Sequence, residues 1–208
     1  SIGGGISGAA NGDTVTVRGG AQVTTGRISI GASGGAGGTL NVTGTGTSLT
    51  VSEQHSSAVY CEAVNVTNGA TLTASSETVG IAAMGGDVTV TGGSTLTTNC
   101  KYGVYISNGK LTVDASSKLI TNGTVAPFCI VDSNSSKSQS DVLALPGVPE
   151  GTQIASVTGT STGSARSYWS IIPANGSLSV SNENNDVVAL SGAKKGKLTF
   201  AKASTPGG

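Results

Sequence analysis

The chain is poor in the side chains that build a conventional globular core or a charged binding surface. Only 3% of its 208 residues are aromatic, only 11% are charged, and the formal net charge is zero. The 11 Lys and Arg residues are scattered, which argues against nucleic acid because that partner requires a clustered basic footprint. No apolar run approaches the roughly 20 residues that span a bilayer, so we expect no membrane insertion.

The start of the chain also lacks a recognisable targeting signal. The opening SIGGGISGAANGD has neither a basic start nor an apolar stretch, and its first residue is Ser rather than Met. We therefore expect a processed product or a piece of a longer chain. The closing STPGG is typical of the beginning of a linker.

Glycine is abundant instead, with 33 residues, and Ser, Thr and Asn fill most of the remainder. A chain rich in Gly is a candidate for disorder, but disordered segments usually combine high net charge with few β-branched residues. Here the charge is balanced, and Val and Thr recur in alternating runs. Short β-strands are the better interpretation.

A period of about 24 residues organises these runs. An apolar-polar-apolar triplet returns five times, and its first positions differ by 25, 24, 24 and 23 residues. The triplets are Val15–Val17, Leu40–Val42, Val64–Val66, Val88–Val90 and Leu111–Val113. A second motif follows each triplet after a turn that contains Gly or Ser. Its central apolar residues are Val23, Leu49, Leu72, Leu96 and Leu119. Because the triplet and the second motif recur with the same period, they indicate a repeat architecture.

Each repeat also contains a third apolar run of more variable length. These runs lie at residues 28–30, 58–60, 79–83, 104–106 and 128–131. Three short strands joined by Gly-rich corners describe one coil of a three-sided solenoid, and coils must stack because one alone cannot bury its inner face. The expected fold is all-β, a right-handed parallel β-helix. A β-sandwich is the main alternative, but it has no reason to keep a constant coil length.

The alternation within the strands predicts which residues face the core. The central residues of the second motif, Leu49, Leu72, Leu96 and Leu119, are expected in one internal stack, and the middle residues of the first triplets are expected outside. Thr24, Thr50, Thr73 and Thr97 are expected to form an external ladder beside the leucines. Glycine at the corners permits the positive φ that sharp turns need.

The repeat loosens after Asp132, so we divide the chain into two parts. Residues 1–132 are assigned to solenoid repeats, and residues 133–208 to irregular strand-rich coils or a cap. The second part keeps strand-like segments without the period: VLAL, TQIASV, YWSII, SLSV, VVAL and KLTF. Trp169 suits a cap with its own small core. No comparable cap precedes the first repeat, which favours further coils upstream.

Two segments carry a resemblance to known proteins. Residues 26–52, GRISIGASGGAGGTLNVTGTGTSLTVS, resemble the repeats of bacterial autotransporter passengers and related surface adhesins. Residues 63–99, AVNVTNGATLTASSETVGIAAMGGDVTVTGGSTLTTN, are similar to β-helical surface proteins of gut and cellulolytic bacteria, some of which bind carbohydrate. The resemblance covers residues 12–132. It implies a bacterial cell-surface or extracellular location and adhesion or glycan binding, and it supplies no catalytic residues.

Tyrosines in the third runs are the candidate ligand-binding residues. Tyr60 and Tyr105 lie two coils apart with the small Ala82 and Ala83 between them, and Tyr102 is close by in sequence. Facing outward, they would flank a trough about 10 Å across, since two inter-coil steps separate them. Sugar rings stack on such aromatic faces, and Lys101 is placed to bind hydroxyls. The alternative is that the rings pack inward or cover a corner.

Catalytic and metal-binding constellations are sparse. Enzymes on this fold group carboxylates on one face, but the acids of the repeats form no obvious column, although Asp13 and Glu62 share a corner position. His55 is the only histidine and lies in the polar insertion SEQHSS, which favours a surface residue over a Ser-His-Asp device. We expect no metal and no cofactor.

The three cysteines are an odd number for a chain placed outside the cell. Cys61, Cys100 and Cys129 are 39 and 29 residues apart, which fits no metal-ligand spacing. Cys61 and Cys129 fall in or beside third strands, where a small buried hydrophobe suits the interior. One disulfide with a free thiol and three reduced thiols both remain open.

The sequence therefore favours a non-enzymatic, secreted or cell-surface module that binds a polysaccharide or a host or cell-surface glycan. A rigid rod can present repeated weak contacts to a repetitive partner and gain affinity through avidity. Three alternatives remain. They are a fragment of a polysaccharide lyase or glycoside hydrolase, a purely structural spacer, and, with less support, an ice-binding surface built on the Thr ladder.

Overall fold

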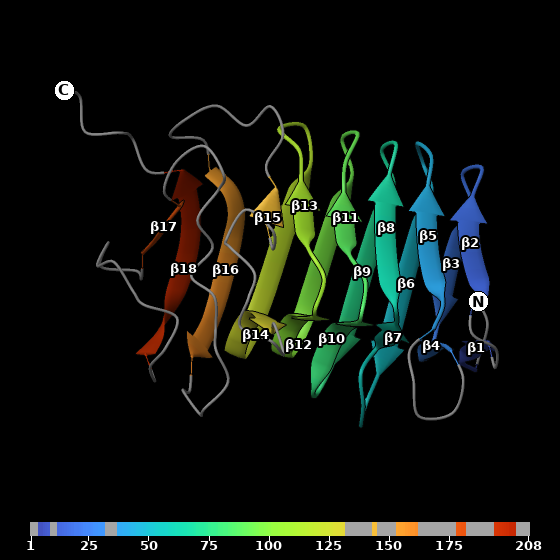
Figure 1. Cartoon of the computed structure of the whole chain (residues 1–208), viewed down its shortest axis with the longest axis horizontal. Coiled ribbons are helices and arrows are strands. Elements are labelled where there is room, and N and C mark those ends of the chain that lie inside the picture. The colour runs from blue at the N-terminus through green and yellow to red at the C-terminus, as the bar shows by residue number, and fades with distance from the viewer. Residues whose placement is uncertain are drawn as a thin grey trace.

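A computed structural model describes residues 4–8, 12–31, 37–131, 143–144, 153–161, 178–181 and 194–202, and from residue 121 onward it describes the backbone alone. The strands of successive repeats are stacked side by side along the long axis (Figure 1). None of these residues belongs to a helix, so this part of the chain holds no helix that could cross a membrane. The fold is an all-β parallel solenoid with a coil spacing of about 24 residues.

The first strands of the repeats form one parallel sheet, seen at the front of Figure 1. Its members are β2 (Thr14–Arg18), β5 (Thr39–Thr43), β8 (Ala63–Thr67), β11 (Val88–Val90), β13 (Leu111–Val113) and β15 (Leu143–Ala144). From β2 to β13 each residue pairs with one 23 to 25 residues further along the chain. The predicted period and the predicted first strands are thus confirmed, and the winding makes about four turns.

The second strands build the predicted leucine stack. They are β3 (Gln22–Thr25), β6 (Ser48–Glu53), β9 (Thr71–Ser76) and the first parts of β12 (Thr95–Ser107) and β14 (Lys118–Val131). Leu49, Leu72, Leu96 and Leu119 pair in one continuous row, and none is more than 2% exposed. The stack is therefore confirmed, and it forms a continuous dry interior with the inward Val and Leu residues of the first strands.

The third strands follow the prediction in the first three repeats only. They are β4 (Ile28–Ile30), β7 (Val59–Cys61) and β10 (Val79–Met84), preceded in their row by β1 (Ile6–Gly8). In the next two repeats the second and third strands run together as β12 and β14. The prediction of three separate strands is wrong there, because a register irregularity between Cys100 and Tyr102 replaces the corner and bends the continuous strand.

Beyond β14 the stack continues without the period. β16 (Gln153–Ser161) pairs parallel to β14, and β18 (Lys194–Lys202) and β17 (Leu178–Ser181) add antiparallel partners. The predicted strand segments VLAL, TQIASV, SLSV and KLTF coincide with β15, β16, β17 and β18. The YWSII and VVAL segments, including Trp169, lie outside the described residues, and the division at residues 132 and 133 stays a prediction.

The corner between first and second strands contains a row of buried hydroxyl groups. Thr47, Ser94 and Ser117 occupy equivalent positions in different coils, with Ala70 at this position between Thr47 and Ser94, and the three hydroxyl residues are 1%, 1% and 7% exposed. The turns beside them use left-handed backbone, for example at Asn68 and Gly69, with φ of 58° and 78°. Their N–H groups need acceptors: Gly69 donates to Ser94 Oγ at 3.1 Å. The row therefore satisfies buried backbone donors from one coil to the next.

Replacing Ser94 with alanine is expected to lower the free energy of unfolding by about 1–3 kcal/mol. The change removes the acceptor of Gly69 N–H and the hydroxyl that donates to the Thr91 carbonyl at 2.7 Å, and both partners are only partly accessible to water that could replace the lost bond. Urea denaturation of Ser94→Ala measures the effect. Ser52→Ala is the matched control, since this side chain of β6 is exposed and its loss should change stability by less than about 0.5 kcal/mol. Equal losses for the two variants would contradict a supporting role for the buried row.

Candidate ligand-binding face

The third-strand face carries the tyrosines on its outer side. Both sequence neighbours of Tyr60 in β7 are fully buried, whereas Tyr60 itself is half-buried. The same holds for Tyr105 in β12, between two fully buried residues. Because successive side chains of a strand point to opposite sides, both rings lie outside the core.

Ala82 sits between the two tyrosines in a single row. In β10 it pairs with Tyr60 on one side and Tyr105 on the other, and Tyr60 pairs in turn with Ser29 of β4. We call Ser29, Tyr60, Ala82 and Tyr105 the tyrosine row. The two tyrosine backbones are about 10 Å apart, from two inter-strand steps. Ala82 is only 5% exposed although it is on the outer side, so neighbouring side chains cover most of it.

Ala83, the other small residue of the strand between the tyrosines, faces the core and does not belong to the tyrosine row. Ala83 is fully buried and pairs with Cys61 and Ile106, two residues of the core. The alternation that turns Ala82 outward necessarily turns its neighbour inward. Of the two alanines, only Ala82 therefore lies on the outer side between the two tyrosines.

Tyr102 and Lys101 lie apart from the tyrosine row, near the bend of β12. Tyr102 is half-buried and pairs with Val79 and Ala126. Lys101 is exposed and occupies the register irregularity just before it. Of the four predicted binding residues, the structure thus brings Tyr60 and Tyr105 together and leaves the other two at the neighbouring corner.

Arg27 belongs to this face, and the sequence analysis missed it. Its guanidinium carbon lies 5.9 Å from the centre of the Tyr60 ring, within the range of a cation–π contact. Arg27 comes two residues before Ser29, so both side chains emerge on the same side, and Ser29 pairs with Tyr60. The two-residue spacing of Arg27 and Ser29 already indicates that both side chains are on one side. Their position opposite Tyr60 could not be predicted, because residues 54–58 lengthen the next coil before β7 and obscure the register of the third strands.

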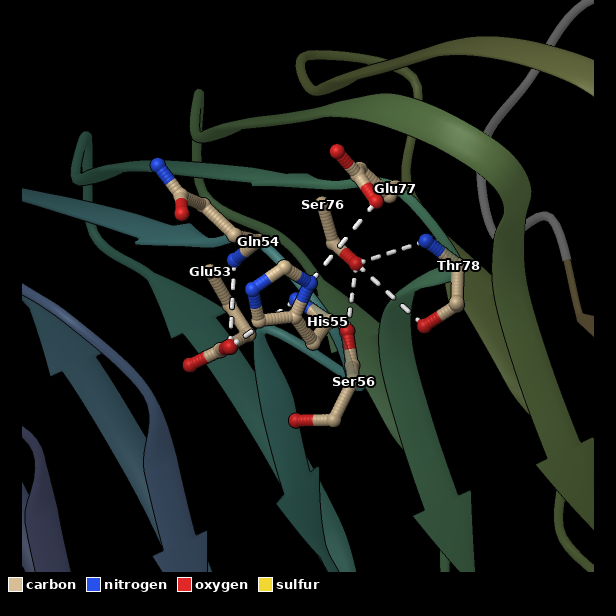
Figure 2. A network of polar contacts seen from close by, with 7 residues as sticks. All are labelled: Glu53, Gln54, His55, Ser56, Ser76, Glu77 and Thr78. Carbon is tan, nitrogen blue, oxygen red and sulfur yellow. Dashed lines mark hydrogen bonds and ion pairs between the residues drawn. The ribbon is translucent and has the colours of Figure 1, made fainter.

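A polar network holds that longer corner (Figure 2). His55 Nδ1 is 3.9 Å from Glu77 Oε2, and both side chains are exposed, at 82% and 68%. Glu53 Oε1 accepts a 3.1 Å hydrogen bond from the backbone N–H of His55. The Ser76 hydroxyl donates to the Ser56 carbonyl, and no hydrogen bond joins it to the His55 ring among the described contacts. These contacts tie two coils together and do not form a nucleophile–base relay.

The described carboxylates serve the corners of the solenoid. Asp87 Oδ1 accepts from the Lys110 backbone N–H at 2.8 Å, and Asp114 Oδ2 accepts from Gly92 N–H at 2.7 Å. Slight burial opposes ionisation of Asp114, but hydrogen bonds from Ser117, Gly92 and their neighbours outweigh it and lower its pKa. Both aspartates thus satisfy backbone donors, which favours a structural role.

Asp13 and Glu62 occupy the same corner row, as predicted. Gly38 occupies the position between them in this row. It is stacked next to Asp13 on one side, and on the other side its carbonyl accepts a 2.8 Å hydrogen bond from Glu62 N–H. The coil of Gly38 therefore separates the two acids. Within the residues whose side chains are described, no group of three His, Cys, Asp or Glu is arranged to hold a metal ion.

Cys61 and Cys100 are buried free thiols. Burial raises the pKa of Cys61 to about 12 and that of Cys100 to about 11. Each thiol donates to a backbone carbonyl, Cys61 to Ala63 at 3.3 Å and Cys100 to Tyr102 at 3.0 Å. They stay protonated at neutral pH and act as small core side chains. Cys129 pairs with Tyr105 in the backbone register, and its side chain lies outside the described residues.

Comparisons with protein-family models, with curated proteins and with solved structures give no match. Function therefore has to be inferred from the geometry of this chain.

Proposed function

We propose that the chain is a non-enzymatic module that binds a polysaccharide or a cell-surface glycan along its third-strand face. The observation that supports it is the tyrosine row, in which two outward aromatic rings flank one small residue on adjacent strands. Rings of this kind offer an apolar face for a sugar ring and a hydroxyl group for hydrogen bonding. An extracellular, bacterial setting and a role in adhesion belong to the same proposal, and they rest on composition and resemblance.

The rigid stack favours an extended ligand over a small one. The strands of Tyr60 and Tyr105 are paired in parallel on both sides, so the backbone sets the spacing of the two residues before binding, which lowers the ordering cost. A polymer with a short repeat meets both rings at once, and additional repeats of the polymer gain affinity through avidity. A lyase or hydrolase would need a carboxylate pair beside the bound sugar, whereas the described Asp87 and Asp114 carboxylates accept backbone hydrogen bonds at corners.

A glycan array probed with the full chain tests the proposal. We expect Tyr60→Ala and Tyr105→Ala each to weaken binding by about 5- to 30-fold, since truncating an aromatic anchor typically costs about 1–2 kcal/mol or more. Tyr60→Phe is the matched control. It keeps the ring and should retain most of the affinity, while thermal unfolding verifies that each variant is folded.

Binding that ignores both alanine changes would refute the assignment to this face. An array without any bound glycan would leave a structural spacer as the better description. An ice-binding role would show as growth inhibition of ice crystals that Thr73→Ala abolishes and Tyr60→Ala does not.

A further inference from the structure

Arg27 carries a positive charge that no described carboxylate neutralises. The ion pair between His55 and Glu77 is the one found among the residues with described side chains, so none of their carboxylate oxygens lies within 4.0 Å of Arg27. The guanidinium packs against Tyr60 instead. A cation held against an aromatic face of a proposed binding row is a site of attraction for an anion.

The backbone on both sides of Arg27 is held by neighbouring coils. The Arg27 carbonyl accepts from Ile6 N–H at 2.8 Å, and the next residue pairs with Val59 of β7. The side chain is half-buried, and its Nε atom is buried without a hydrogen-bond partner. The terminal N–H groups of a guanidinium lie in one plane and form a rigid fork. That geometry suits two parallel hydrogen bonds to one carboxylate or sulfate.

We infer that the glycan bound by this face is acidic and that Arg27 binds its carboxylate or sulfate group. This inference rests on the proposed function. The anionic group of one sugar unit pairs with Arg27 beside Tyr60, and the chain of sugars continues over Ala82 towards Tyr105. Arg27 and Tyr60 therefore act together as an anion-and-ring subsite at one end of the tyrosine row.

A glycan array that contains uronic acid oligosaccharides, their methyl esters, sulfated glycans and the unsulfated counterparts tests the inference. We expect binding to acidic members and at least about tenfold weaker binding to each neutral counterpart. Arg27→Gln should lower affinity for the acidic members about tenfold or more, equivalent to about 1.4 kcal/mol. Arg27→Lys keeps the charge but loses the fork, so its affinity should fall between those of Arg27→Gln and the parent chain. The carboxylate and sulfate arms identify which anion is preferred.

Arg18→Gln is the matched control for non-specific attraction. Arg18 is an exposed cation at the end of β2, on the first-strand sheet, and its removal changes the net charge by the same amount. Its affinity should stay within about twofold of the parent, because simple charge neutralisation away from the site is weak and screened by salt. Equal losses for Arg18→Gln and Arg27→Gln would overturn the assignment to Arg27.

The two proposals fail in different ways. Neutral glycans bound as tightly as acidic ones, with loss on Tyr60→Ala and none on Arg27→Gln, would overturn the acidic ligand and keep the glycan-binding face. An array without binding of any glycan would overturn both.

Discussion

Replacing Leu72 with alanine is expected to lower the free energy of unfolding by about 2–5 kcal/mol. Leu72 is fully buried at the centre of the leucine stack, where it pairs with Leu49 on one side and Leu96 on the other. Coils of a solenoid contact only their neighbours, so a cavity at this position weakens two coil–coil interfaces at once. Urea denaturation followed by circular dichroism measures the loss.

Two variants serve as controls for Leu72→Ala. Leu72→Met fills most of the same volume and should cost less than about 1.5 kcal/mol. Thr73→Ala changes the next residue, which belongs to the outward row and is half-buried, and it should cost less than about 1 kcal/mol. If Leu72→Ala were no more destabilising than Thr73→Ala, the leucine stack would not be the main source of stability.

The first and second strands were predictable because two simple regularities coincide in them. Val and Leu alternate with Thr and Asn, which fixes the inward side, and the constant coil length fixes the register. Asn41 and Asn65 show how closely the register is kept: the amide of Asn65 donates to the Asn41 side chain at 2.9 Å, one coil away. A sequence that repeats both signals leaves few alternative ways to stack.

The third strands carry weaker signals, and the candidate site is built on them. Residues 54–58 lengthen one corner, and β12 runs through the next corner without a break, so the third runs cannot be aligned by counting residues. The pairing of Tyr60 with Tyr105 across Ala82 could be anticipated from strand alternation, whereas the contact of Arg27 with Tyr60 depends on the exact register and on side-chain reach.

Buried hydroxyl groups were missed for a different reason. Ser and Thr are normally exposed residues, so the sequence placed them on the flanks. Thr47 and Ser94 are buried because left-handed turns direct backbone N–H groups into the stack, and a small acceptor has to meet them. The only sequence signal is the return of a hydroxyl residue at the same point of the period.

The other large expected effect on stability arises at the corner between a third strand and the first strand of the next repeat, where the coils approach closely. Gly86 and Gly109 stack one above the other there, and a β-carbon on Gly109 would overlap the Gly86 carbonyl oxygen and lie 3.0 Å from Ile106 Cγ2. The first-strand pairing of Val88 with Leu111 immediately follows and prevents the coils from separating. Gly109→Ala is therefore expected to cost about 3 kcal/mol or more, because overpacking against backbone has no flexible side chain to absorb it.

Gly26→Ala is the matched control for this steric effect. A β-carbon on Gly26 would meet nothing closer than 3.5 Å, an ordinary contact with the Gly4 carbonyl oxygen, and neither glycine has the positive φ that would penalise alanine by itself. Alanine has fewer backbone conformations than glycine in the unfolded chain. Gly26→Ala should therefore leave the free energy of unfolding unchanged or raise it by about 0.4–1 kcal/mol. The two Gly→Ala changes are thus expected to shift the midpoint of thermal unfolding in opposite directions or by very different amounts. A Gly109→Ala variant as stable as Gly26→Ala would mean that the coils have room at this corner and that the contact between Gly86 and Gly109 does not limit their approach.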